Sequence, residues 1–217
     1  MNKSITRGYF ITVEGSDGVG KSTQIHNIEN YFLKLGYEVQ LTREPGGTSI
    51  GDKLRDILLD VSNDEMNEMT EMLIYAASRA QHIKELIEPS LKKGKIVISD
   101  RYIDSSIAYQ GYGRRLGEDV VKIVNEYASF GLIPDLTFWL DLDPELGRKR
   151  ILSRSIIQDK DVTFDRIELE KNDFHNRVRE GYKEIARKNP ERVHRIDASL
   201  KADDVWEEIE LILRKII

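Results

Sequence analysis

Residues 15–22 carry the most specific chemical pattern in the chain, because they read Gly-Ser-Asp-Gly-Val-Gly-Lys-Ser. This order matches G-x-x-x-x-G-K-[ST], and it stands between an apolar run and a segment of helical periodicity, as the motif requires. The glycines allow successive backbone N–H groups to converge on phosphate oxygens at a helix N-terminus. Lys21 adds a positive charge near the β and γ phosphates, and the Ser22 hydroxyl is a ligand for Mg²⁺. The predicted nucleoside triphosphate site comprises Gly15, Ser16, Asp17, Gly18, Val19, Gly20, Lys21, Ser22 and Thr23.

An aspartate and an arginine follow the apolar run 96–99. At the carboxyl end of a parallel strand beside the phosphate loop, Asp100 is placed to hold Mg²⁺ directly or through water. Arg101 is adjacent and is a candidate clamp for a second phosphate; alternatively, Asp100 caps a helix and Arg101 pairs with a surface acid. Arg43 stands at the end of a second expected strand, before Pro45 and two glycines. It is a further candidate anion clamp, although an ordinary turn explains this segment equally well.

Tyr75 and Arg79 stand four residues apart in a long segment of helical periodicity, so they share one helix face. An aromatic ring that stacks on a base and a guanidinium that bonds its edge would form half of a nucleobase pocket. The alternative is that the tyrosine is a core residue and the arginine is solvated.

Five short runs with β-branched or aromatic residues alternate with longer segments of helical periodicity, a pattern typical of a parallel sheet between two layers of helices. The expected strands are 9–14, 38–42, 95–99, 136–141 and 193–197. In the longest helical segment the apolar stripe runs from Met69 through Leu73 to Ile87, and this stripe should face the sheet. We therefore predict an α/β fold of the P-loop NTPase type: three α/β/α layers, a five-stranded parallel sheet, flanking helices and a lid.

The polar stretch 153–165 lies between two helical segments and is expected to be a mobile loop. With its flanking residues it is a candidate lid, at about residues 148–166. We see no linker or internal repeat, so residues 1–217 are expected to form a single domain.

The composition excludes several classes of protein. The chain has 217 residues, a formal net charge of −5, four histidines and no cysteine, which excludes a disulfide framework and a Cys-ligated zinc site, so a metal must be held by oxygen. No global positive charge attracts nucleic acid or anionic lipid. No apolar run resembles a signal peptide or a membrane span, so a cytoplasmic protein without nucleic-acid or membrane partners is expected.

Four segments together resemble the thymidylate kinase family in order and spacing. They are residues 9–22, 42–48, 75–82 and 100–111, and the resemblance extends over nearly the whole chain. The family phosphorylates dTMP to dTDP with ATP and Mg²⁺. The resemblance therefore implies a transferase of nucleotide biosynthesis, a nucleoside monophosphate kinase that supplies dTTP synthesis.

The resemblance also assigns the dTMP site residue by residue. It implies that Asp17 contacts the sugar 3′-hydroxyl, that Arg43 and Arg101 clamp the phosphate, and that Arg79 bonds the thymine edge. Tyr75 takes the position of the base-stacking aromatic, which is usually Phe in the family. The remaining positions that match the base and sugar lining are Ser105, Ser106, Tyr109 and Gln110.

The residue after Asp17 is Gly18, so the phosphate loop cannot supply the family's catalytic arginine. The segment resembles the lid of the bacterial-type enzymes, and by that match Arg154 bridges the donor and acceptor phosphates. The lid is longer than usual here, and a solvated basic helix end is an alternative explanation for its cations. The resemblance further implies a homodimer.

Two other functions stay open at this stage. One is the same chemistry on another pyrimidine nucleotide or deoxynucleotide. The other is a P-loop NTPase switch, although the sequence has no Asn-Lys-x-Asp after a strand to recognise guanine.

Overall fold

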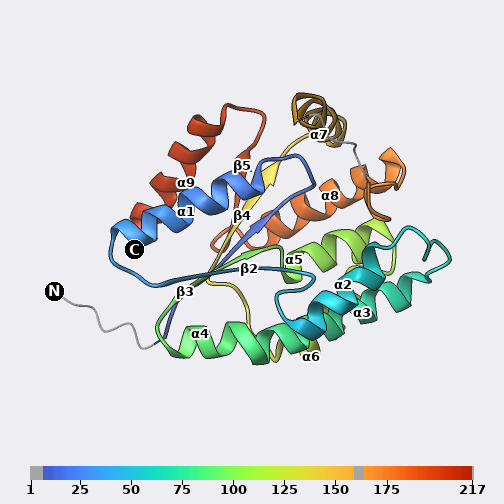
Figure 1. Cartoon of the computed structure of the whole chain (residues 1–217), viewed down its shortest axis with the longest axis horizontal. Helices are drawn as coiled ribbons and strands as arrows, with labels where there is room; N and C mark the ends of the chain where they lie inside the picture. Colours follow the sequence, from blue (N-terminus) through green and yellow to red (C-terminus); the bar gives the residue numbers. More distant parts are fainter. Residues whose placement is uncertain (1–6, 159–163, 217) are drawn as a thin grey trace.

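The computed structural model describes residues 7–158 and 164–216. Five parallel strands form one sheet in the order β2-β3-β1-β4-β5 (Figure 1). Their bounds are Phe10–Glu14 for β1, Val39–Arg43 for β2, Ile96–Asp100 for β3, Leu136–Asp141 for β4 and Val193–Asp197 for β5. The five strand predictions are confirmed to within one residue at each end.

Strands β1 and β4 are buried along their whole length and β3 up to Asp100, as expected for a parallel sheet covered on both faces. Helices and π-helical turns connect them. Their bounds are α1 Lys21–Lys34, α2 Ser49–Leu59, α3 Glu68–His82, a π-helical segment Ile83–Ile87, α4 Glu88–Lys92, α5 Ile103–Ser106, a second π-helical segment Ile107–Gly113, α6 Glu118–Ser129, α7 Pro144–Gln158, α8 Asn172–Lys188 and α9 Ala202–Ile216.

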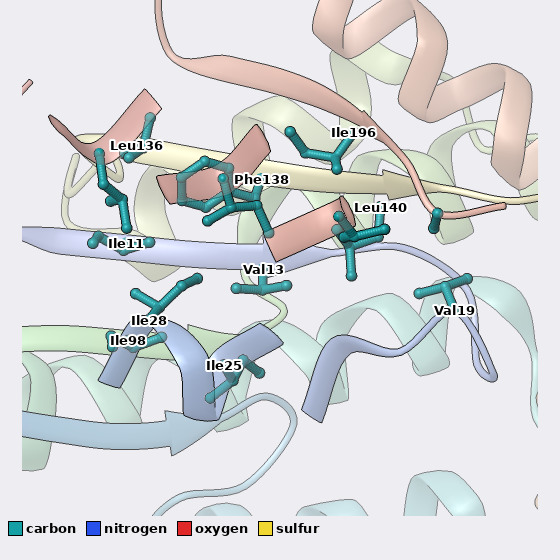
Figure 2. Packing of buried hydrophobic residues seen from close by; sticks show 14 of the residues in the cluster. Ile11, Val13, Val19, Ile25, Ile28, Ile98, Leu136, Phe138, Leu140 and Ile196 are labelled. Atoms are coloured by element: carbon teal, nitrogen blue, oxygen red, sulfur yellow. The ribbon is translucent and has the colours of Figure 1, made fainter. Parts of the chain in front are cut away.

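Helices α1 and α9 cover one face of the sheet (Figure 1). Figure 2 shows Ile25 and Ile28 of α1 beside Val13, Ile98 and other strand residues of this core. On the opposite face, α8 and the second π-helical segment pack on the sheet through a separate apolar cluster around Trp139 and Tyr182. The three-layer prediction is therefore confirmed.

The apolar stripe of the longest helical segment is only partly directed into the core. Met72, Ala76 and Ile87 are buried as expected, but Met69 and Leu73 are 41% and 50% exposed. The prediction that the whole stripe faces the sheet is therefore wrong at these two positions.

Helix α7 occupies part of the stretch 153–165, for which the sequence predicted a loop. It continues to Gln158, so residues 153–158 extend the helix, and the prediction of a loop is wrong for these six residues. The helix begins directly beside the phosphate loop, where a Cβ on Gly18 would come 2.3 Å from the Gly147 carbonyl oxygen. The loop and α7 can pack at this distance because neither glycine carries a side chain.

Candidate active site

The phosphate loop connects β1 to α1. Gly20 precedes the first turn of α1 with φ of 98°, a left-handed conformation that glycine adopts at little cost. The Lys21 ammonium folds back over the loop and donates to the carbonyl oxygens of Gly15 at 3.1 Å and Ser16 at 3.0 Å. It also lies 3.3 Å from Asp17 Oδ1. The Lys21 ammonium therefore lies over the phosphate loop at the start of α1.

Arg101 reaches the same loop from the end of β3. Its guanidinium donates to the Gly15 carbonyl oxygen at 2.7 Å and to Asp17 Oδ1 at 2.9 Å. Desolvation opposes ionisation of Asp17, but the charges of Arg101 and Lys21 hold the pKa of this carboxyl well below its usual range. Two cations and one anion thus lie together beside the loop.

The backbone of Arg101 is strained, because its φ of 69° is unfavourable for a residue with a side chain. Neighbouring bonds stabilise it: Arg101 N donates to the Val13 carbonyl at 3.0 Å, and Ser99 Oγ donates to the Arg101 carbonyl at 2.8 Å. The next residue, Tyr102, donates its N–H to Glu14 Oε1 at 2.8 Å. These bonds fix the direction of the Arg101 side chain.

Glu14 itself is fully buried at the end of β1. Besides Tyr102 N, its carboxyl accepts from Ser105 Oγ at 2.5 Å and from Tyr182 OH at 2.9 Å. Burial raises the pKa of Glu14 to about 7, and the charge of Asp104 acts in the same direction.

A cavity opens next to Asp17 and Arg101. It brings together eight residues of the predicted acceptor site from three segments of the chain: Asp17, Tyr75, Arg79, Arg101, Ser105, Ser106, Tyr109 and Gln110. Tyr109 and Gln110 lie in the π-helical segment Ile107–Gly113, an irregular geometry that often occurs at functional sites. The cavity is lined in addition by Glu44, Pro45, Arg55, Leu59, Tyr102, Asp165 and Ile167.

Arg79 is only 2% exposed, so the alternative of a solvated arginine is wrong. Its Nε donates to Glu44 at 2.8 Å and its Nη1 to Asn125 Oδ1 at 2.5 Å. Its Nη2 donates to the Tyr102 carbonyl and to Ser106 Oγ. These four bonds within the described residues use four of the five guanidinium N–H groups, which leaves one on Nη1 for a ligand.

A second hollow, beside the start of α1 and the end of β2, contains the two predicted metal ligands. Ser22 and Asp100 both line it, together with Arg43. Asp100 Oδ1 is buried and accepts no hydrogen bond from the described residues, a condition that a cation would relieve. No three His, Cys, Asp or Glu side chains gather into a metal site within residues 7–158 and 164–216. The donor set fits Mg²⁺ held by one or two protein oxygens and substrate phosphates.

The chain is similar to proteins of one family over nearly its whole length. The family model described as thymidylate kinase matches residues 13–209. The thymidylate kinase of Clostridium novyi is 45% identical over 210 residues, which are 97% of this chain and 100% of that protein. That of Lactobacillus delbrueckii subsp. bulgaricus is 49% identical over 194 residues, 89% of each chain. The chain belongs to the thymidylate kinase family.

A solved structure supports the same assignment. The crystal structure of thymidylate kinase from Ehrlichia chaffeensis aligns with a TM-score of 0.74 at 35% identity, covering 95% of this chain and 98% of that one.

Arg43 is the predicted dTMP residue that does not line the cavity around Tyr75 and Arg79; it lines the hollow that contains Ser22 and Asp100. Its side chain is 55% exposed and pairs with Asp52 at 3.2 Å. Arg55 of α2 lines the cavity instead and donates to the Pro45 carbonyl at 3.0 Å, next to the cis Glu44–Pro45 peptide bond. Sequence reasoning missed Arg55 because a single arginine in an amphipathic helix has the pattern of an ordinary solvated residue.

A third hollow lies between the phosphate loop, α7 and α8. It is lined by Ser16, Asp17, Arg148, Phe164, Glu168 and His175, among others, and the Arg148 guanidinium lies 5.1 Å from the centre of the Phe164 ring. The Arg154 side chain and residues 159–163 of the lid lie outside the described residues, so the predicted role of Arg154 stays a prediction.

Proposed function

We propose that this thymidylate kinase family member transfers the γ-phosphoryl group of ATP to dTMP and produces dTDP. Its relatives are named thymidylate kinase and cover nearly the same length. One geometric observation carries the proposal: Asp17 lines both the phosphate loop and the cavity that contains Tyr75 and Arg79. A donor phosphate on the loop and an acceptor nucleotide in the cavity would therefore meet at Asp17 and Arg101.

Phosphoryl transfer requires positioning and positive charge more than proton chemistry. In our proposal, Lys21 neutralises the β and γ phosphates, while Arg101 clamps the phosphate of dTMP and lies next to the transferred group. The Asp17 carboxylate accepts a hydrogen bond from the sugar 3′-hydroxyl. Ser105 and Tyr109 line the cavity on the sugar side.

The proposed base pocket contains side chains that hydrogen bonds to neighbouring residues already fix, among them Arg79 and Gln110. Tyr75 supplies a ring for stacking, and Arg79 presents its remaining N–H group to the base edge. Ser106 and Gln110, which are 3% and 1% exposed, line the same cavity, and Ser106 accepts a hydrogen bond from Arg79. We also assign a role to Arg55, since it places a further cation in the cavity where Arg43 does not.

The donor base has a separate candidate site. A hollow beside the start of α1 is lined by Gly20, Thr23 and the segment 198–202. Arg150 of α7 lines it as well and donates to the Ala198 carbonyl at 2.9 Å. We propose that adenine lies here, with the planar Arg150 guanidinium as one wall.

Ser22 and Asp100 would hold Mg²⁺. When bound, the ion would offset negative charge on the β and γ phosphates of ATP. Arg154 remains our candidate for a lid arginine, and Arg148 joins it because its side chain lines the hollow beside Asp17.

We propose that the protein is a homodimer. Apolar side chains on neighbouring helices α3 and α6 are exposed, among them Leu73 at 50%, Ile123 at 57% and Tyr127 at 80%. Burial of such a patch against a second copy would remove it from water.

No helix in the described part of the chain has the length and apolar content to cross a bilayer. We propose that the enzyme acts in the cytoplasm as a single domain, without nucleic-acid or membrane partners.

The test is an assay of ADP release with ATP, Mg²⁺ and each of dTMP, dUMP, UMP, dCMP, AMP and GMP. We expect activity to be highest on dTMP and to fall at least 100-fold in Arg101→Ala, because a preorganised cation at the transferred group is lost. Arg187→Ala is the matched control, since Arg187 is exposed and pairs only with its helix neighbour Glu184 in the described structure. ATP hydrolysis that is equal with every acceptor would refute the proposal.

A further inference from the structure

Glu71, in the first turn of α3, is a fully buried carboxylate surrounded by donors. Arg114 binds it through Nε at 3.1 Å and Nη2 at 3.0 Å, and Arg166 Nη2 binds it at 2.6 Å. A third donor is the Gln110 side-chain amide, whose Nε2 lies 2.9 Å from Glu71 Oε1.

The charge state of Glu71 follows from these contacts. Burial opposes ionisation, but the hydrogen bonds and charge of Arg114, with contributions from Gln110 and Arg166, lower the pKa of this carboxyl. Glu71 is therefore ionised at neutral pH, and an ionised carboxylate has no proton to donate.

This charge state fixes the orientation of Gln110. Only the NH₂ group of the amide can face an acceptor, so Nε2 must point to Glu71 and the carbonyl Oε1 must point away from it. Gln110 lines the cavity with Tyr75 and Arg79, and its Oε1 accepts no hydrogen bond from residues 7–158 and 164–216. The group offered to a base in the cavity is then an acceptor and not a donor.

We propose that Glu71 is a specificity-determining positioning residue, which locks Gln110 so that the pocket selects pyrimidines that donate a hydrogen bond at N3. This inference rests on the proposed function. Thymine and uracil carry N3–H, whereas the N3 atom of cytosine is an acceptor and would face the Gln110 carbonyl oxygen without a proton between them. A buried site with a fixed polar group rejects a ligand that leaves this group unpaired.

Glu71 also has structural partners, so the test must separate selectivity from stability. Arg166 donates to the Leu58 carbonyl at 2.9 Å and precedes Ile167, which lines the cavity. A purely structural Glu71 would alter activity on every pyrimidine nucleotide to the same extent.

The experiment measures kcat and KM for dTMP and dCMP in the full-length wild type and in variants. In Glu71→Gln the new amide can donate or accept, so Gln110 can reverse its orientation. We expect the ratio of kcat/KM for dTMP to that for dCMP to fall at least tenfold, through KM for both nucleotides. Glu71→Asp keeps the charge between the two arginines but draws it away from Gln110, and the same fall in ratio is expected.

The matched control is Glu170→Gln. Glu170 pairs with the same Arg114 but has no bond to Gln110 in the described structure, so the ratio should stay within twofold of wild type. A ratio unchanged in a folded Glu71→Asp variant would overturn the inference even if Glu71→Gln does not fold, and folding is checked by thermal melting. Wild-type protein without activity on dTMP would instead refute the proposed function.

Discussion

The buried Glu14 carboxyl should make the free energy of unfolding depend on pH. Burial raises its pKa from the ordinary value of 4.5 to about 7 in the folded protein. Because the pKa is higher in the folded state, the protonated form favours folding. The stability contributed by this group is complete below about pH 4.5 and is lost as the pH rises through 7.

The size of the effect follows from the shift. A difference between 4.5 and about 7, at about 1.4 kcal/mol for each pKa unit, corresponds to about 3 kcal/mol. Glu14→Gln stays neutral at every pH and has nearly the same shape. Its carbonyl can accept from Tyr102 N, and its NH₂ group can donate to the Ser105 or Tyr182 hydroxyl, since a hydroxyl also accepts.

We therefore expect the variant to gain about 3 kcal/mol relative to wild type between pH 4.5 and pH 8. The assay is urea unfolding of both proteins across this range at constant ionic strength. Glu207→Gln is the control, because Glu207 is exposed on α9 and should show no such change. Parallel stability curves for wild type and Glu14→Gln would refute the reasoning and would mean that Arg101 keeps Glu14 ionised.

Three further predictions concern the site. Asp100→Asn should raise the Mg²⁺ concentration for half-maximal activity several-fold, because the buried Oδ1 loses its charge; a magnesium titration at saturating ATP checks this. Arg55→Met should raise KM for dTMP at least tenfold and Arg43→Met by less than threefold, since Arg55 alone of the two lines the cavity; steady-state kinetics would show whether this order is reversed. Gly47→Ala should lower stability by about 1–3 kcal/mol in urea unfolding, because Gly47 has φ of 80° and a Cβ would lie 2.7 Å from His82 Nε2; unchanged stability would contradict it.

The sheet was predictable from sequence because each strand is a short run that contains β-branched or aromatic residues, and the three middle strands are mainly apolar. The lid region was not, since the residues from Ser153 to Gln158 are compatible with a helix as well as with a loop. Their polarity indicates exposure and not the lack of a helix. Leu73 was misplaced for a related reason: periodicity identifies an apolar face but not the surface that covers it.

In the candidate site, features that depend on consecutive residues were predictable, whereas contacts between distant segments were not. The phosphate loop was predictable because its function depends on eight consecutive residues. The buried environment of Arg79 was not, because its partners Glu44, Tyr102 and Asn125 come from three other segments. Arg55 was missed because only the fold brings α2 to the edge of the cavity.

The contacts of Gly15 and Asp17 explain how one loop could serve both substrates. The Gly15 carbonyl accepts from Lys21 Nζ and from Arg101 Nη1, and Asp17 Oδ1 contacts the same two side chains. The cation proposed for the donor and the cation proposed for the acceptor thus share the same two anchors. Bound phosphates would compete for these cations and leave the Asp17 carboxylate to accept from a sugar hydroxyl. Gly15 and Asp17 already hold Lys21 and Arg101 beside the loop, so these two side chains would lose little conformational entropy when the phosphates bind. This preorganisation favours phosphoryl transfer between two substrates bound next to each other.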